Sequence, residues 1–301
     1  MKINRDNKKM YIGIEIKRIL MEKRFHVTIL LLVSTAIIMT FPNFLPEKID
    51  YINSTSTQKI LTFNDIIVWK SSLGTRMMTA FLPLFPVIIY GHSLVDDIES
   101  GYANQIIKNI GYKKYYTSKL ISSIISGGLC LFLTSILLYC LLRIIYFTGI
   151  DMENLDKALN LKYEFKLIKT ITFSSKLLYV LFISSILFIL GTIYASMGFL
   201  VSLFTNNKML IYTIPIFGLR IYEDIVYLIS LILSKVFSEN YGNNFYISYS
   251  IFFELGNYND GKFIFNSILL GIVIFMIIKK KLLKQIRCEV DFYEFKAITN
   301  K

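Results

Sequence analysis

The sequence is poor in the residues that build disulfide frameworks and metal sites. Only three cysteines and two histidines occur among its 301 residues. Cys130 and Cys140 fall on one predicted helix, about 15 Å apart at about 1.5 Å per residue, which is too far for a disulfide. No cysteine or histidine spacing typical of a metal site is present. These scarcities argue against a disulfide-stapled secreted protein and against a membrane metalloprotease.

The chain also lacks the phosphate-binding sequence GxxxxGK[ST]. Without this P-loop it has no standard cradle for the phosphates of ATP. If ATP drives the protein, another chain must hydrolyse it. The sequence therefore predicts no enzyme activity, no catalytic residue, no metal ligand and no cofactor in this chain.

Acidic residues are fewer than basic ones, with 21 Asp and Glu against 33 Lys and Arg, for a formal net charge of +12. In a soluble protein this excess would indicate nucleic-acid binding. Here 54% of the residues are hydrophobic and the mean hydropathy is +0.54. The basic residues flank long apolar runs, as topology signals do. The composition predicts an all-α integral membrane protein in contact with lipid, without a nucleic-acid partner.

Six segments are long and apolar enough to span a bilayer, which takes about 20 residues each. The predicted spans are Phe25–Phe44, Leu73–Leu94, Leu120–Phe147, Leu177–Phe204, Met209–Ile229 and Phe263–Ile278. An even number puts both termini on one side, and Lys and Arg cluster before the first span and after the last. By the positive-inside rule that side is the cytoplasm. Lysines in the predicted outer loop Thr148–Lys176 disagree, but moving this loop inside would require losing or splitting a span.

The segment of about residues 8–24 has the pattern of an amphipathic helix. Ile12, Ile16, Ile19 and Leu20 fall at i, i+4, i+7 and i+8, while Glu15 and the other charged residues take other faces. The pattern predicts a helix lying in the inner membrane interface. The alternative is a solvated helix that packs on a partner. No small-residue cleavage site follows, which argues against a cleaved signal peptide.

The polar bridge Val95–Ser123, between the second and third spans, is too short to be a domain. Ser100 is suited to cap a helix at its N-terminus and Gly111 is suited to end one, so the pattern predicts a short helix over about 100–110. The apolar positions of this helix lie along one edge and are Ile106, Ile107 and Ile110. A basic and aromatic cluster suited to the inner membrane surface follows, formed by Lys113, Lys114, Tyr115, Tyr116 and Lys119.

At these residues the sequence resembles the ABC-2 type transporter permeases. Their second-to-third-span connection carries an acid, a glycine, an apolar pair, a basic residue, a tyrosine and a lysine, and the matching residues are Glu99, Gly101, Ile106, Ile107, Lys113, Tyr116 and Lys119. Tyr102 replaces the threonine common after that glycine. Tyr112 follows Gly111 where many members have a proline-containing turn.

The resemblance implies one transmembrane domain over residues 1–301, in the plasma membrane of a bacterium. The N-terminal helix would be the elbow helix, and short re-entrant outer helices over Ile225–Phe237 and Phe245–Leu255 would separate the fifth and sixth spans. The partners would be a second permease, identical or related, and two copies of an ABC ATPase that binds ATP and Mg²⁺.

The helix over 100–110 would be the coupling helix, with its apolar edge in a groove of the ATPase. Tyr115, Tyr116 and Lys119 would anchor its far end at the membrane interface. The implied coupling residues are Glu99, Gly101, Tyr102, Ile106, Ile107, Ile110, Lys113, Tyr116 and Lys119. The short inner turn Thr205–Lys208 resembles the second, smaller ATPase contact of such permeases.

Members of the family mostly export drugs, antimicrobial peptides, polysaccharides or lipids. Few deep charges and no large outer domain favour a hydrophobic or amphipathic substrate here, such as an antibiotic, an antimicrobial peptide or a lipid, with antibiotic resistance as one outcome. The alternative is a non-transporting membrane sensor or immunity protein that binds a ligand at its outer face, along Asn240–Asp260. A receptor needs no apolar-edged helix after its second span, so the bridge favours the transporter.

Two charged groups remain open to more than one interpretation. The acidic residues Asp96, Asp97 and Glu99 suit either a Mg²⁺ or diphosphate site, which would need a second acidic cluster, or the N-terminal region of a helix, which favours acids. Arg220 lies at predicted membrane depth three and four residues before Glu223 and Asp224. This group predicts either a structural ion pair or a lining of the translocation path.

Small residues and prolines predict how the spans pack and bend. Gly191 and Ala195 form a small-xxx-small pair, and the third span begins with several serines and glycines. Both features favour close helix packing, within or between subunits. Pro83 and Pro86 predict a kink in the second span.

Overall fold

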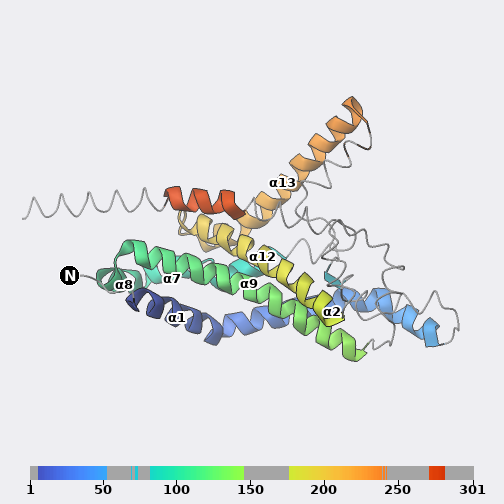
Figure 1. Cartoon of the computed structure of the whole chain (residues 1–301), viewed down its shortest axis with the longest axis horizontal. Helices are drawn as coiled ribbons and strands as arrows, with labels where there is room; N and C mark the ends of the chain where they lie inside the picture. Colours follow the sequence, from blue (N-terminus) through green and yellow to red (C-terminus); the bar gives the residue numbers. More distant parts are fainter. Residues whose placement is uncertain are drawn as a thin grey trace, which may run out of the picture.

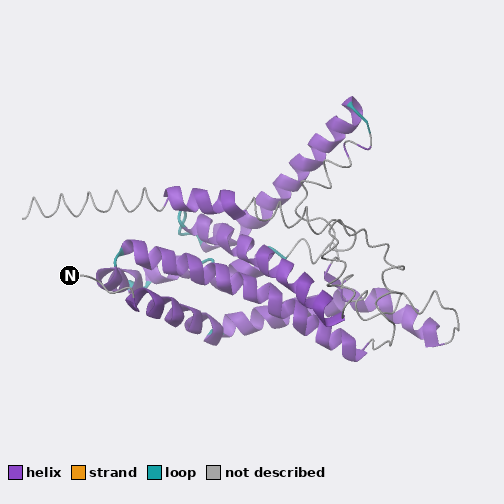
Figure 2. Ribbon diagram, viewed as in Figure 1, coloured by secondary structure: helices purple, strands orange, loops and turns teal. Residues whose placement is uncertain are grey.

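The computed structural model describes residues 6–52, 69, 72–73, 82–145, 176–238, 240, 242 and 271–281. Over these ranges the chain is all helical and has no strand, which confirms the predicted all-α class (Figure 2). The helices are α1 (Asp6–Met21), α2 (Lys23–Ile52), α6 (Leu84–Tyr90), α7 (Ser93–Glu99), α8 (Tyr102–Ile110), α9 (Tyr112–Ile145), α12 (Lys176–Ser202) and α13 (Lys208–Val236). Residues 271–281 form a further helical segment.

Two of the described helices are long and apolar enough to cross a membrane. They cover Tyr112–Ile144 and Leu177–Ser202, which correspond to the predicted third and fourth spans. This finding is compatible with a membrane protein. The six-span topology and the side on which the termini lie stay predictions.

Helices α9 and α12 pack side by side along much of their length (Figure 1). A Cβ atom added to Gly127 would lie 2.6 Å from the carbonyl oxygen of Gly191 and would also meet the Cβ of Ala195. The hydroxyl of Ser123 donates to the carbonyl oxygen of Ala195 at 3.3 Å. The small residues therefore allow close helix packing, as predicted, and the packing is within one chain.

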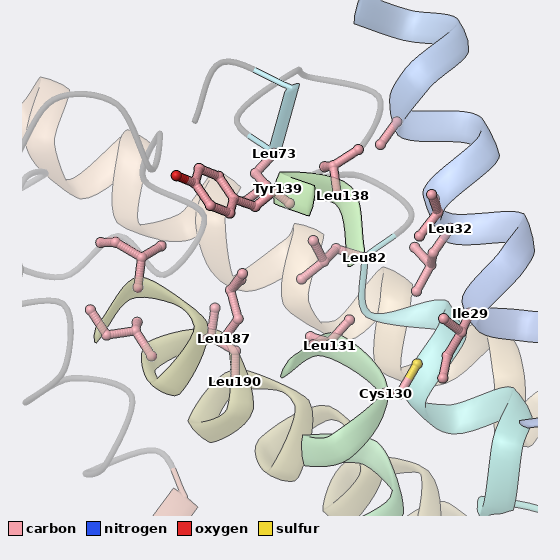
Figure 3. Close-up of a cluster of buried hydrophobic side chains, with 14 of the residues drawn as sticks. Ile29, Leu32, Leu73, Leu82, Cys130, Leu131, Leu138, Tyr139, Leu187 and Leu190 are labelled. Carbon is pink, nitrogen blue, oxygen red and sulfur yellow. The ribbon is translucent and has the colours of Figure 1, made fainter. Parts of the chain in front are cut away.

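The apolar core gathers side chains from several helices around this pair. Ile29 and Leu32 of α2, Leu131 of α9, and Leu187 and Leu190 of α12 belong to one buried cluster (Figure 3). Burial of such side chains contributes about 1.5–3 kcal/mol each relative to exposure to water. This cluster joins α2, α9 and α12.

Helix α1 is present where the sequence predicts it, but its buried face differs from the prediction. Tyr11, Glu15 and Ile19 are 7%, 0% and 2% exposed and form one stripe at i, i+4 and i+8. The prediction placed Glu15 on a polar face, away from the apolar edge. The stripe instead packs toward α9, because Glu15 meets charge partners there that a single helix cannot reveal.

The second predicted span divides into α6 (Leu84–Tyr90) and α7 (Ser93–Glu99) near its C-terminal end. Pro83 is the N-cap of α6 and Pro86 lies in its first turn, whereas the break falls at Gly91 and His92. Residues 74–81 of this span lie outside the described residues.

Helix α13 extends the predicted fifth span to Val236 without interruption. The prediction of a separate short outer helix over Ile225–Phe237 is therefore wrong, because helical hydrogen bonding continues through this apolar run. Its predicted partner Phe245–Leu255 lies outside the described residues. At the start of α13, the Asn207 side chain accepts a hydrogen bond of 3.0 Å from the backbone amide of Met209.

Candidate functional site

Helix α8 follows α7 and precedes α9, with very short connections on both sides. Its two flanking glycines, Gly101 and Gly111, have φ angles of 74° and 80°. A side chain in this left-handed region costs roughly 1–2 kcal/mol, so glycine suits both turns. The predicted end at Gly111 is confirmed. The predicted N-cap at Ser100 is wrong, because the tight turn needs a glycine there and Ser100 instead caps the end of α7.

The apolar edge of α8 is not a free tip. Ile106, Ile107 and Ile110 are half-buried and pack against a core cluster of this same chain. The fully exposed positions of the helix are polar and are Asn104, Gln105, Lys108 and Asn109. The chain's own core covers much of the three isoleucines, and their entry into a partner's groove stays a prediction.

A buried group of charges, here called the inner charge cluster, lies next to α8. It consists of Glu15 and Arg18 of α1, Asp97 of α7 and Lys119 of α9. The Nζ atom of Lys119 lies 3.0 Å from Glu15 Oε2 and 2.6 Å from Asp97 Oδ2, and the three side chains are at most 2% exposed. Arg18 closes the group at 3.3 Å from Asp97 Oδ1 and 3.9 Å from Glu15 Oε1. Two acids and two bases balance in charge, although Arg18 is 46% exposed and only the other three members are buried.

Three tyrosine hydroxyls complete the hydrogen bonding of the cluster. Tyr11 donates to Glu15 Oε1 at 2.8 Å, Tyr90 donates to Glu15 Oε2, and Tyr115 donates to Asp97 Oδ2 at 2.9 Å. With the contacts from Lys119 and Arg18, every carboxylate oxygen of the two acids has a donor. Buried charge is tolerated when paired and hydrogen-bonded in this way.

The charges also set the protonation of Glu15. Burial alone would raise the pKa of this carboxyl, but Lys119 and the hydrogen bonds from Tyr90 and Tyr11 hold its pKa below the ordinary value. Burial lowers the pKa of Arg18, and Asp97 and Glu15 more than reverse this effect. Glu15 and Arg18 are therefore ionised at neutral pH, as the pairing requires.

A second, more exposed set of charges joins the start of α13 to α7. Lys208 Nζ lies 2.7 Å from Asp96 Oδ1 and 3.0 Å from Glu99 Oε2. Asp96 also meets His92 at 3.2 Å and Arg24 at 3.5 Å. Hydrogen bonds to the two acids raise the pKa of Lys208 to about 12. The predicted second inner contact at Thr205–Lys208 is thus tied to the helix that leads into α8.

The predicted anchors of the bridge have different roles from those expected. Tyr115 and Lys119 are 0% exposed, so other parts of the chain cover them completely. On α9 they face the carboxylates of α1 and α7. Lys113 is exposed, and Tyr116 is half-buried with its ring stacked on that of Tyr112.

The acidic residues of the bridge separate into different contacts. Asp97 enters the inner charge cluster, while Asp96 and Glu99 bind Lys208. All three lie on α7, and Asp96 falls in its first turn, which agrees with the helix-terminus interpretation for that residue. Within the described ranges, no group of three or more metal-binding side chains occurs.

Two clefts flank α8. One, of about 570 Å³, opens beside the inner charge cluster, and its lining residues are Arg18, Asp96, Asp97, Ser100, Tyr102 and Gln105. The other, of about 450 Å³, is lined by Asn104, Ile107, Lys108 and Tyr112. Helix α8 therefore has a cleft on each side and is here called the α8 ridge.

The candidate translocation residues lie apart from this site. Arg220 is half-buried and Asp224 is exposed on α13, and the side chain of Glu223 lies outside the described residues. Neither Arg220 nor Asp224 belongs to the inner charge cluster. The predicted ligand-binding stretch Asn240–Asp260 of the alternative function lies outside the described residues except for positions 240 and 242.

Sequence reasoning did not predict the ion pairs that form the inner charge cluster. Glu15 is 104 residues from Lys119 and Asp97 is 79 residues from Arg18. The available signal was a glutamate in line with Tyr11 and Ile19 on one helical face, where a purely interfacial helix would place an apolar residue.

No family model matches the sequence, and no solved structure matches it. The chain is similar to the uncharacterized protein YybM of Bacillus subtilis (strain 168), with 25% identity over 137 residues. The match covers 46% of this chain and 53% of YybM, so the chain spans about half the length of that relative. This similarity brings no activity with it, and the function has to be argued from the site.

Proposed function

We propose that this chain is the membrane-spanning permease subunit of an ATP-driven exporter of the ABC-2 type. The observation that carries the proposal is the α8 ridge. Very short connections join it to α7 and α9, and two clefts flank it. Such a ridge suits a partner that pushes on it. ATP and Mg²⁺ would bind to that partner, an ABC ATPase expected in two copies.

The contacts around α8 support a mechanical role. One glycine at each end connects α8 to its neighbours in tight turns, so a displacement of α8 must move α7 and α9. The Lys119–Asp97 ion pair joins these two helices a second time, and Glu15 adds α1 to the same unit. Packed elements of this kind move as rigid bodies. A displacement of α8 would therefore move the long helix α9 and, through their shared packing, helix α12.

The rest of the assembly follows from the same proposal. The protein would have six spans with both termini in the cytoplasm, α1 as its elbow helix, and a second permease, identical or related, as its partner. The exported substrate would be hydrophobic or amphipathic, such as an antibiotic, an antimicrobial peptide or a lipid.

Site-specific photocrosslinking in living cells tests the proposal. A photoreactive amino acid at Asn104 or Lys108, which are exposed on α8, should give an adduct in which mass spectrometry finds a P-loop ATPase. The same amino acid at Lys235, exposed near the other end of α13, serves as the matched control and should not form this adduct. Because Ile106 and Ile107 are partly covered by the chain itself, these polar positions disturb the fold less than substitutions of the isoleucines would.

The result that overturns the proposal is equally specific. If α8 crosslinks to no nucleotide-binding protein while the chain is inserted and folded, or if Lys235 gives the same ATPase adduct, then α8 is not the coupling element.

A further inference from the structure

An apolar pocket lies on the side of the bundle where α9, α12 and the helical segment 271–281 meet. Its volume is about 320 Å³, at the lower end of the range for ligand pockets of about 300–1,000 Å³. The apolar residues that line it are Ile124, Ile189, Ile193, Gly271, Ile272 and Phe275. Two hydroxyls also line it, but Thr192 and Ser196 donate to carbonyl oxygens of their own helix, at 2.6 Å and 2.7 Å. The pocket therefore favours an apolar occupant.

Lysines stand one turn beyond the pocket. On the segment 271–281, Lys279 follows Phe275 by four residues and Ile272 by seven, so it shares their face, about 6 Å further along the axis. Lys279 and Lys280 are exposed. Lys281 is held over the ring of Phe204, with its Nζ 4.3 Å from the ring centroid. The pocket thus has an apolar lining, and exposed lysines lie about one turn further along the segment 271–281.

The position of the pocket along the helices fits one leaflet of a bilayer. The contact between Lys281 and Phe204 sets the lysine end of the segment beside the end of α12, which finishes at Ser202. Ser196 lies six residues before that end, or about 9 Å. Half of a hydrocarbon core is about 15 Å thick, so the pocket lies at acyl-chain depth below a basic surface.

We propose that this pocket binds an acyl chain of an anionic phospholipid, with the phosphate headgroup held by Lys279 and Lys280. Charge complementarity favours this occupant over a second copy of the chain. A two-fold interface centred on this face would set the lysines against their own copies, whereas a phosphate neutralises them. Basic residues beside grooves between membrane helices bind anionic headgroups by the same physics. The inference needs only a membrane location, and it does not depend on an ATPase or on transport.

Lipid retention measured by native mass spectrometry tests the headgroup part. The full-length protein is released from nanodiscs that contain equal amounts of phosphatidylglycerol and phosphatidylethanolamine. The wild-type chain should keep phosphatidylglycerol preferentially. The double variant Lys279→Gln/Lys280→Gln should reduce this preference by about fivefold per lysine, because each lysine near an anionic surface contributes about 1 kcal/mol. The control Lys17→Gln/Lys23→Gln removes two exposed lysines elsewhere and should leave the preference unchanged.

Filling the pocket tests the acyl-chain part. A Cβ on Gly271 would lie 3.5 Å from Ile193 Cγ1, an ordinary contact, so a larger side chain there grows into the pocket. Gly271→Phe should abolish retention of both lipids at this site. Gly218→Phe on α13, where nothing lies within 4 Å of the added Cβ, is the matched control. If Gly271→Phe does not fold, Ile272→Trp at a position 54% exposed blocks the mouth of the pocket instead.

Four results would overturn the proposal. Equal retention of both lipids by the wild type removes the headgroup site. A loss of preference in the lysine variant with normal retention in Gly271→Phe means surface attraction without a pocket. A change in oligomeric mass in Gly271→Phe assigns the pocket to a second copy. No retained lipid in the wild type, together with a destabilised Gly271→Phe, assigns it to another segment of this chain.

Discussion

Two regions of this protein place ionisable groups among apolar helices, and they do so in opposite ways. In the inner charge cluster, Glu15 and Lys119 are 0% exposed and meet where α1, α6, α7 and α9 converge. On α13, which projects away from the bundle, Arg220 is half-buried and Asp224 is exposed (Figure 1). The comparison teaches that convergence of several helices, and not apolar sequence around a charge, decides whether that charge is buried.

The energetic consequence differs between the two regions. A buried charge that loses its partner costs several kcal/mol, because no water can replace the partner. An exposed charge keeps its solvation and its loss is small. The charges of the inner charge cluster therefore help to hold the fold together, whereas the exposed Asp224 of α13 is expected to contribute little to it.

The largest effect is expected from Lys119→Met. This change leaves Glu15 and Asp97 buried beside one half-exposed arginine, and should lower the free energy of unfolding by about 3–5 kcal/mol. Thermal unfolding of the detergent-purified protein measures this effect. Lys113→Met, which removes an exposed lysine from the same helix, is the control and should change stability by no more than about 0.5 kcal/mol.

A neutral version of the cluster separates charge from packing. In Lys119→Met/Glu15→Gln/Asp97→Asn no buried charge is left without its partner, so much of the lost stability should return. If Lys119→Met is as stable as the wild type, the cluster does not stabilise the fold, and the contrast in stability between the cluster and α13 fails.

Acidification is expected to have the next largest effect. The pKa of Glu15 is held below its ordinary value, and the pKa of Asp96 is also lowered because Lys208, His92 and Arg24 outweigh its partial burial. A carboxyl with a lowered folded-state pKa stabilises the fold above its unfolded pKa, and this contribution is lost as the pH falls through the folded value. These carboxyls should therefore make stability fall below about pH 4. A separate decrease should begin at about pH 6.5, because burial lowers the pKa of His92 and the unfolded chain then binds a proton that the folded chain does not.

Unfolding measured between pH 7 and pH 3 checks this dependence, and Glu15→Gln provides the matched variant. Without the Glu15 carboxyl, the decrease at low pH should be smaller than in the wild type. An identical decrease in both proteins would show that other groups dominate acid unfolding, and that the cluster has no special share in it.

The local features of the fold could be predicted from the sequence because they depend on neighbouring residues. The end of α8 at Gly111, the helix before the first span, and the close packing at Gly191 and Ala195 all follow from short spacings. The capping role of Ser100 was predicted wrongly, because the tight turn from α7 requires the positive φ of Gly101.

The site itself could not be predicted in the same way. Whether Glu15 is buried depends on Lys119, more than 100 residues away, and helical periodicity gives no information on that distance. The prediction of a separate helix over Ile225–Phe237 came from the family resemblance, whereas the apolar run itself continues as one helix to Val236. Charge pairing across helices is a property of the packed bundle, and a sequence pattern reveals only that a charge occupies an unusual place.

The smallest effect is expected from Asp224→Asn on α13. The side chain is exposed, so removal of its charge should change the free energy of unfolding by no more than about 0.5 kcal/mol in detergent, where solvent or detergent contacts it in both proteins. The same thermal unfolding assay that follows Lys119→Met measures this change. If this residue lines a translocation path, export should fall in Asp224→Asn while the folded yield stays the same, since the charge would act on a substrate and not on the fold. A destabilisation comparable to that of Lys119→Met would mean instead that Asp224 is a buried structural partner in the assembled protein, and the contrast between the two regions would disappear.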